Sequence, residues 1–199
     1  MGKERKNAHN PQAVQKLAIG GILTALVVVL QMMGAFIKFG PFAVSLVLIP
    51  IVLGAALCDY KTSAWLGFVF GVVVLCTDAV AFLVVSVPGT VITVLLKGTL
   101  CGLVSGLVYK ALENVNRYVA VIAAAMICPF VNTGVFLLGC VVFFFETIRE
   151  WGAAAGFENA AKFLIFGMVG INFVVELTVN IVLSPIVVRL LDFSKKIGK

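Results

Sequence analysis

The stretch Pro88–Tyr109 reads PGTVITVLLKGTLCGLVSGLVY and contains a single charged residue, Lys97. As an α-helix it would be about 33 Å long, close to the hydrocarbon thickness of a bilayer. Gly98, Gly102 and Gly106 recur at intervals of four and therefore share one helical face, on which another helix can approach closely. The stretch therefore predicts a membrane-spanning helix with a packing face.

Lys97 is the unusual residue of this helix. An ammonium group at membrane depth costs about 3 kcal/mol or more unless it reaches the surface, meets water or finds a partner. Two interpretations are open: the long side chain extends to the nearer membrane surface, or it belongs to a binding site. Because charges inside membranes are usually functional, the second interpretation is favoured.

The composition identifies the chemical class of the chain. Of 199 residues, 62% are hydrophobic and 12% are charged, and the mean hydropathy is +1.15, which no soluble domain of this size shows. The sequence predicts one integral membrane domain in contact with the lipid bilayer. The basic residues occupy short polar joints, so we expect no nucleic-acid partner. His9 is the only histidine and the five cysteines form no CxxC pair, so we expect no metal site, cofactor or disulfide.

The apolar segments predict an all-α membrane protein, a bundle of six transmembrane helices. A cytoplasmic tail at 1–16 would precede the domain at 17–191, and a second cytoplasmic tail would cover 192–199. The expected helices cover 17–36, 46–58, 63–85, 88–109, 118–145 and 160–191. Eleven of the 15 basic residues lie in the N-terminal tail, in the joints at 59–62 and 110–117 and at the C-terminal end (189–199), which predicts that both termini are cytoplasmic.

A second group of polar residues lies on the last predicted helix. Asn172, Glu176 and Asn180 are spaced by four and share one face at membrane depth. The least costly arrangement turns Glu176 toward Lys97 or toward a wet cavity. Asn132, near the possible kink at Pro129, is also expected at mid-depth. Asp78 lies either at the headgroup level, which is slightly favoured, or turned inward.

Small residues also mark the first predicted helix. Gly20 precedes Thr24, and Gly21 precedes Ala25, by four residues, so the two pairs form a smooth stripe. The stripe serves either packing inside this bundle or docking of another membrane subunit. The spacing does not favour one over the other.

The chain lacks the usual catalytic motifs. It contains no GxxxxGK[ST], HExxH or GxSxG sequence and no evident pair of nucleophile and base, so the sequence predicts that the protein is not an enzyme. A membrane-embedded binding protein is the favoured class. The alternative is a stand-alone secondary transporter or channel for a small polar solute, with Glu176 as a proton-binding group, although no inverted repeat is visible.

Four stretches carry a likeness to a known family: KLAIGGILTALVVVLQ, IPIVLGAALCDYKTSAWLGFVFGVV, LLKGTLCGLVSGLVYKAL and VNTGVFLLGCVVFF. In these the chain resembles the substrate-specific (S) components of energy-coupling-factor (ECF) transporters, which are bacterial vitamin-uptake subunits. The resemblance implies a plasma-membrane protein with six helices, a vitamin pocket in its outward half, and a membrane coupling subunit bound to two cytoplasmic ATPase subunits. The family's helix 1 carries an Ala-xxx-Ala pair, and the matching residues here are Gly21 and Ala25.

Residues and resemblance together predict two sets of functional positions. The partner-docking set is Gly20, Gly21, Thr24 and Ala25. The substrate-binding set is Lys97, Asn132, Asn172, Glu176, Lys38 and Thr93. A lysine beside amides suits a ligand with a carboxylate and with amide or hydroxyl groups, which fits pantothenate best. Folate and riboflavin are larger and would require more aromatic stacking.

Overall fold

The computed structural model describes residues 11–34, 38–39, 42–43 and 47–197. Its long helices are α1 (Pro11–Gly34), α3 (Tyr60–Thr77), α5 (Val87–Leu112), α6 (Arg117–Phe143) and α9 (Gly170–Ile197). The shorter elements are α2 (Leu48–Leu57), α4 (Val80–Leu83), α7 (Phe145–Ala154), α8 (Ala160–Lys162) and the π-helix η1 (Phe163–Val169). Two short strands, β1 (Lys38–Phe39) and β2 (Phe42–Ala43), pair antiparallel.

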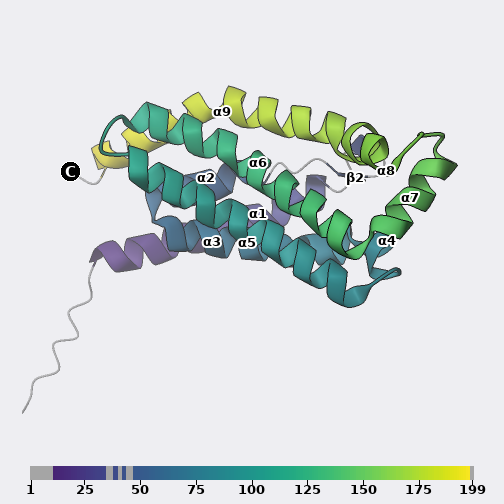
Figure 1. Cartoon of the computed structure of the whole chain (residues 1–199). Coiled ribbons are helices and arrows are strands. Elements are labelled where there is room, and N and C mark those ends of the chain that lie inside the picture. The colour runs from purple at the N-terminus through teal and green to yellow at the C-terminus, as the bar shows by residue number, and fades with distance from the viewer. Residues whose placement is uncertain (1–10, 35–37, 40–41, 44–46, 198–199) are drawn as a thin grey trace, which may run out of the picture.

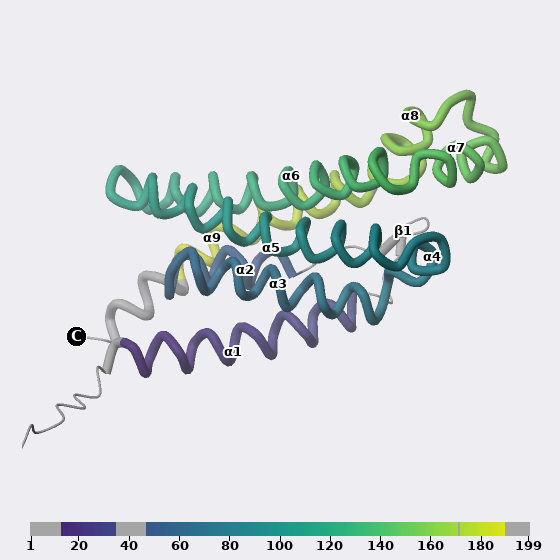
Figure 2. The backbone as a smooth tube through the Cα atoms, turned by 60° about the horizontal axis from the view of Figure 1, so that its bottom comes forward, coloured from purple at the N-terminus to yellow at the C-terminus, as the bar shows by residue number. Residues whose placement is uncertain are grey.

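The long helices run alongside one another and form an elongated bundle (Figures 1 and 2). One end of the bundle carries α4, α7, α8 and the β1–β2 pair. The start of α1, the α5–α6 joint and the end of α9 lie at the other end (Figure 1). Within the described residues, five helices are long and apolar enough to cross a membrane, and α2 and the segment Ala160–Val169 are shorter apolar helices. The fold is therefore that of a helical membrane bundle, while the count of six spans stays a prediction.

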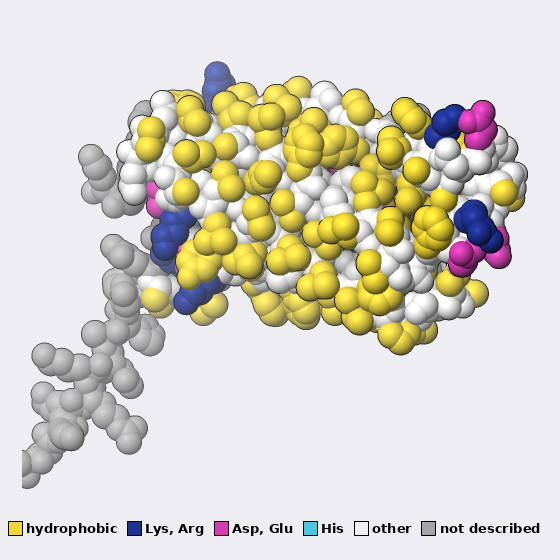
Figure 3. Space-filling model, in the orientation of Figure 1, with side chains coloured by type: hydrophobic (Ala, Val, Ile, Leu, Met, Phe, Trp, Pro, Cys, Tyr) yellow, Lys and Arg dark blue, Asp and Glu magenta, His cyan; other side chains and the backbone are white. Residues whose placement is uncertain are grey.

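The surface has the polarity of a membrane protein. Figure 3 shows hydrophobic side chains over the middle of the bundle, with lysine and arginine gathered near the end where α1 begins. Acidic and basic side chains occur together at the opposite end, where Arg149 pairs with Glu146 at 2.8 Å. A broad apolar belt between two charged ends matches a bundle whose middle contacts lipid.

The tight contact between α3 and α5 confirms the glycine face that the sequence predicts. A Cβ atom on Gly98 would fall against the Gly67 carbonyl oxygen, and one on Gly106 would lie 2.7 Å from Tyr60 Cα. The Ser63 hydroxyl lies 2.8 Å from the Gly102 carbonyl oxygen and 2.9 Å from that of Ile51 on α2. Close backbone approach thus fixes α5 against α3, and the other side of α5 packs on α6.

The start of α3 differs from its predicted position. The turn predicted at 59–62 is shorter in the structure, because α3 already begins at Tyr60. There Asp59 caps the helix by accepting a 2.8 Å hydrogen bond from the Thr62 N–H.

The segment predicted as an outer loop, 146–158, largely forms helix α7. Its charged residues point outward, whereas Ile148 and Gly152 are buried, and amphipathic helices of this kind are easily mistaken for polar loops.

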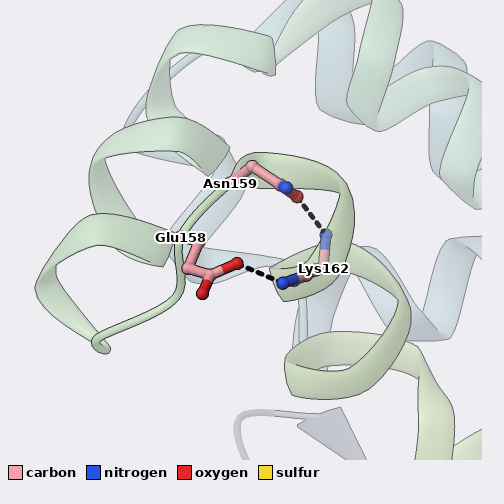
Figure 4. Close-up of polar contacts among 3 residues, drawn as sticks. All are labelled: Glu158, Asn159 and Lys162. Carbon is pink, nitrogen blue, oxygen red and sulfur yellow. Dashed lines mark hydrogen bonds and ion pairs between the residues drawn. The ribbon is translucent and has the colours of Figure 1, made fainter.

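The last helix is interrupted near its beginning. The predicted single helix at 160–191 starts as the short α8, widens into the π-helix η1 and continues as α9. Asn159 caps α8 by accepting a 2.8 Å hydrogen bond from the Lys162 N–H, and the Lys162 side chain pairs with Glu158 (Figure 4). The interruption places η1 beside the cavity described below.

The orientation of the bundle in the membrane gives a first testable prediction. In intact cells, a membrane-impermeant thiol reagent should label Glu158→Cys and spare Lys61→Cys, since the count of basic residues places the joint at 59–62 in the cytoplasm. Both side chains are exposed, so accessibility within the fold does not bias the comparison. The parent protein supplies the background from its own cysteines. Labelling of Lys61→Cys from outside would reverse the predicted orientation.

Candidate functional site

A partly open cavity lies among α1, α3, α4, α5, α6, η1 and α9. It has about 690 Å³ of empty space, part of which is open to solvent. Its lining comprises Gln31, Val74, Asp78, Ala79, Phe82, Val94, Lys97, Asn132, Thr133, Phe136, Met168, Val169, Asn172, Phe173 and Glu176. By helical rise, Lys97 is about 15 Å from the start of α5, so the cavity reaches the middle of the bundle.

Four of the six predicted binding residues meet in this cavity. Lys97 reaches it from α5, Asn132 from α6, and Asn172 and Glu176 from α9. Asn132, Asn172 and Glu176 are each no more than 7% exposed. These side chains come from three separate helices, and they form one polar wall only in the folded bundle.

The other two predicted residues are not part of this lining. Thr93 is buried, but it packs where α5 meets α6 at Gly139. Lys38 belongs to strand β1, and its side chain lies outside the described part of the structure. Their role in binding stays a prediction.

Lys97 points into the cavity. Its ammonium lies 5.3 Å from the ring centroid of Phe136 and 5.6 Å from that of Phe70, within the range of cation–π attraction. Glu176 and Asp78 are close enough for their charges to act on it. This geometry favours the binding-site interpretation over extension to the membrane surface.

Asp78 and Gln31 are cavity residues that the sequence analysis did not assign to the site. The expectation that Asp78 lies at the headgroup level is wrong, because its carboxylate turns inward. Gln31 Nε2 donates a 2.7 Å hydrogen bond to Asp78 Oδ2, and the Thr77 hydroxyl donates a second one of 2.9 Å. Gln31 is only 2% exposed. A glutamine inside an otherwise apolar helix was the signal that could have indicated this pair.

Three buried oxygen atoms in the cavity wall lack a hydrogen bond. They are Gln31 Oε1, Asp78 Oδ1 and Asn132 Oδ1, and no donor among the described residues reaches them. A buried acceptor without a partner costs about 1–3 kcal/mol, so these positions require water or a bound molecule. The described protein groups alone therefore do not satisfy all the hydrogen-bond acceptors of the cavity wall.

The remaining wall of the cavity is aromatic and apolar. Phe82 and Phe136 meet edge to face with ring centroids 5.8 Å apart, and Phe173 lines the same space. Met168 and Val169 come from η1, where the wider π-helical turn changes the direction of the side chains. A cavity with a few convergent polar groups and an apolar wall is suited to binding an organic molecule.

The described residues contain no group of three or more His, Cys, Asp or Glu side chains that could hold a metal ion. Among the described residues, the polar lining of the cavity comprises one lysine, two carboxylates, three amides and the hydroxyl of Thr133. These groups surround a single space and can contact a polar molecule there.

A family model described as ECF transporter, substrate-specific component, matches residues 15–188, which is most of the chain. The protein belongs to this family. No curated protein and no solved structure gives a significant match. The resemblance seen in the sequence is thereby confirmed at the level of the family, which is a family of transporter components rather than enzymes.

As an S component, the protein is the substrate-binding subunit of an ECF importer, a multi-pass protein of a prokaryotic plasma membrane. The family implies a small-molecule substrate and association with the other subunits of the ECF module. Within the described residues, the cavity around Lys97 presents polar groups beside an aromatic wall.

The small residues on α1 of this S component fall into two groups. The Thr24 hydroxyl accepts a 3.3 Å hydrogen bond from Trp65 Nε1, and a Cβ on Gly20 would contact Thr62, so this pair faces α3. Gly21 and Ala25 are exposed, and nothing lies within 4 Å of a Cβ placed on Gly21. The two alternatives that the spacing left open thus apply to different pairs: one packs internally, and the other presents a smooth outer surface.

Proposed function

We propose that this S component binds a water-soluble vitamin or a related micronutrient in the cavity around Lys97. The observation that carries the proposal is the convergence of Lys97, Asn132, Asn172 and Glu176 on one space beside an aromatic wall. The ammonium of Lys97 supplies the counter-charge for an acidic group of the ligand, and the amides orient its hydrogen-bonding groups. Hydrolysis of ATP takes place in the partner subunits.

Pantothenate, predicted from the lysine and the amides, is the first ligand to test. Folate and riboflavin come next, because Phe82, Phe136 and Phe173 line the cavity and offer aromatic surface for stacking. Small molecules retained by the purified protein, identified by mass spectrometry, provide an unbiased comparison.

Transport assays separate this function from that of a stand-alone carrier. In liposomes, the purified protein alone should bind the retained compound without accumulating it, and the complete ECF module with ATP should drive uptake. Accumulation by the protein alone, driven by an ion gradient, would favour the secondary transporter in which Glu176 binds a proton.

We further propose that Gly21 and Ala25 form the surface on which the membrane coupling subunit docks. Small residues on an exposed helical face permit close approach of a second helix within the membrane. The pair is exposed here, and large exposed side chains such as Leu17 and Ile22 lie next to it. The small pair would therefore form a shallow recess between large apolar side chains, and a partner helix could pack against it.

The docking surface is tested with Gly21→Leu and Ala25→Leu. Either variant should lower ATP-driven uptake by at least about tenfold, because the added side chain holds the partner helix away, while ligand binding by the isolated protein stays unchanged. Gly21→Ala is the matched control, since a single methyl group meets open space and should preserve most uptake. Full uptake by both leucine variants would show that the pair faces only lipid.

A further inference from the structure

We propose that the ligand has a cationic end that also carries N–H donors and that Asp78, assisted by Gln31 and Asn132, binds this end. The inference deepens the proposed function and rests on it. It adds a second recognition point to the one at Lys97, contributed by the ends of α1 and α3 and by the middle of α6.

The first argument is the balance of charge in the cavity. Among the described residues, its charged lining residues are Lys97, Asp78 and Glu176, which is one cation against two carboxylates. In a partly desolvated space, an uncompensated carboxylate is costly, and an additional net anion would increase the repulsion. A ligand that brings a positive charge removes this imbalance.

The second argument is hydrogen bonding. An ionised carboxylate only accepts hydrogen bonds, so Gln31 must turn its NH₂ group to Asp78, and its carbonyl oxygen then remains available. Gln31 Oε1, Asp78 Oδ1 and Asn132 Oδ1 are all buried acceptors without a donor among the described residues. Acceptor groups on a ligand cannot satisfy them. An ammonium, amidinium or protonated amino-heterocycle supplies several N–H donors together with the missing charge.

The third argument is how firmly Asp78 is held. The Gln31 amide and the Thr77 hydroxyl both lie within hydrogen-bond distance of Oδ2, which leaves Oδ1 buried and without a donor among the described residues. An acceptor fixed in this way is prepared for a donor and loses little side-chain entropy on binding. Asp78 thus resembles a binding group more than a helix-terminating residue.

The position of Lys97 completes the description of the ligand. Lys97 enters the same cavity from α5 and is proposed to bind an acidic group. With Asp78 binding a cationic end, the ligand is a zwitterion, and the phenylalanine side chains pack against the apolar or ring portion between its ends. The two charged ends can then be tested independently.

Calorimetric titration of the full-length protein with two probes separates the two ends. Thiamine, which has a cationic thiazolium ring and N–H donors on a neutral aminopyrimidine, tests the Asp78 end, and pantothenate, an acid without a cationic group, tests the Lys97 end. Asp78→Asn should weaken thiamine binding at least about thirtyfold and leave pantothenate binding unchanged or tighter. Lys97→Met should show the opposite pattern. The two variants are expected to change the affinities for the two probes in opposite directions. General damage to the fold cannot produce this pattern, because it would weaken the binding of both probes.

Two further variants keep the test decisive. Thr77→Val removes one hydrogen bond to Asp78 but retains its charge, so the loss of thiamine affinity should be less than about fivefold. If Asp78→Asn does not fold, judged by its gel-filtration profile, Asn132→Asp replaces it. That variant adds a carboxylate beside the proposed group and should favour thiamine and disfavour pantothenate.

The outcomes distinguish this inference from the proposed function. Tight binding of pantothenate, no binding of thiamine and no effect of Asp78→Asn would overturn the inference and leave a vitamin-binding S component. If neither probe binds, the retained compound decides: a molecule without a cationic end contradicts the inference. If no compound is retained and the ECF module drives uptake of none, the proposed function itself is wrong.

Discussion

Replacing Gly98 with alanine is expected to destabilise the bundle by at least about 3 kcal/mol and to lower its thermal midpoint by about 5–10 °C. The new methyl group would fall against the Gly67 carbonyl oxygen and lie 3.1 Å from Gly71 N. Backbone atoms cannot move aside as flexible side chains do, so α3 and α5 would have to separate. The separation loses packing along the whole interface, which outweighs the gain of about 1 kcal/mol from alanine's better helix propensity.

Thermal unfolding of the detergent-purified protein measures this effect. The buried thiols of Cys101 and Cys128 become reactive when the bundle opens, so a thiol-reactive fluorophore reports unfolding directly. Gly134→Ala is the matched control, because it makes the same substitution in helix α6 where a Cβ meets nothing within 4 Å. A midpoint for Gly98→Ala equal to that of Gly134→Ala would show that the α3–α5 contact is looser than described.

Replacing Lys97 with methionine is expected to weaken binding of pantothenate, or of a retained compound with an acidic group, more than a hundredfold. Methionine keeps much of the apolar stem and removes the charge. Asp78 and Glu176 would then face the ligand's acid without a cation between them. Lys97→Arg should also weaken binding, because a planar guanidinium does not replace a compact ammonium between the Phe70 and Phe136 rings.

Calorimetric titration compares these variants with two references. Asn132→Ala should cost less, about 1–3 kcal/mol, as expected for one buried hydrogen bond. Leu96→Met introduces the same residue on the outward side of α5, where the leucine is exposed, and should leave affinity unchanged. Undiminished affinity in Lys97→Met would show that Lys97 does not contact the ligand.

Much of the fold could be predicted from the sequence because membrane helices carry strong local signals. The apolar segments identified the long helices, although α1 begins at Pro11, before its predicted start, and the helix predicted at 63–85 ends at Thr77. The spacing of Gly98, Gly102 and Gly106 predicted the close contact that α5 makes with α3. The predictions failed where local polarity was ambiguous. The charged segment after α6 was interpreted as a loop, although burial of Ile148 makes it an amphipathic helix.

For the site, the sequence alone determined which residues are too polar for lipid. Lys97 and Glu176 had to be compensated at membrane depth, whatever the arrangement of the helices, because desolvation penalises a charge in any apolar surrounding. The periodicity also showed that Asn172 and Glu176 share a face. These conclusions need only helical geometry and the low polarity of the bilayer.

Only the tertiary structure decided how each helix is rotated about its axis. That rotation turns Asp78 and Gln31 into the cavity, leaves Thr93 against α6, and directs Thr24 to α3 while Ala25 faces outward. In a chain so rich in small and apolar residues, many rotations bury similar surface, so periodicity does not distinguish them. The choice depends on backbone contacts between residues far apart in sequence, such as Gly67 with Gly98, which no local pattern specifies.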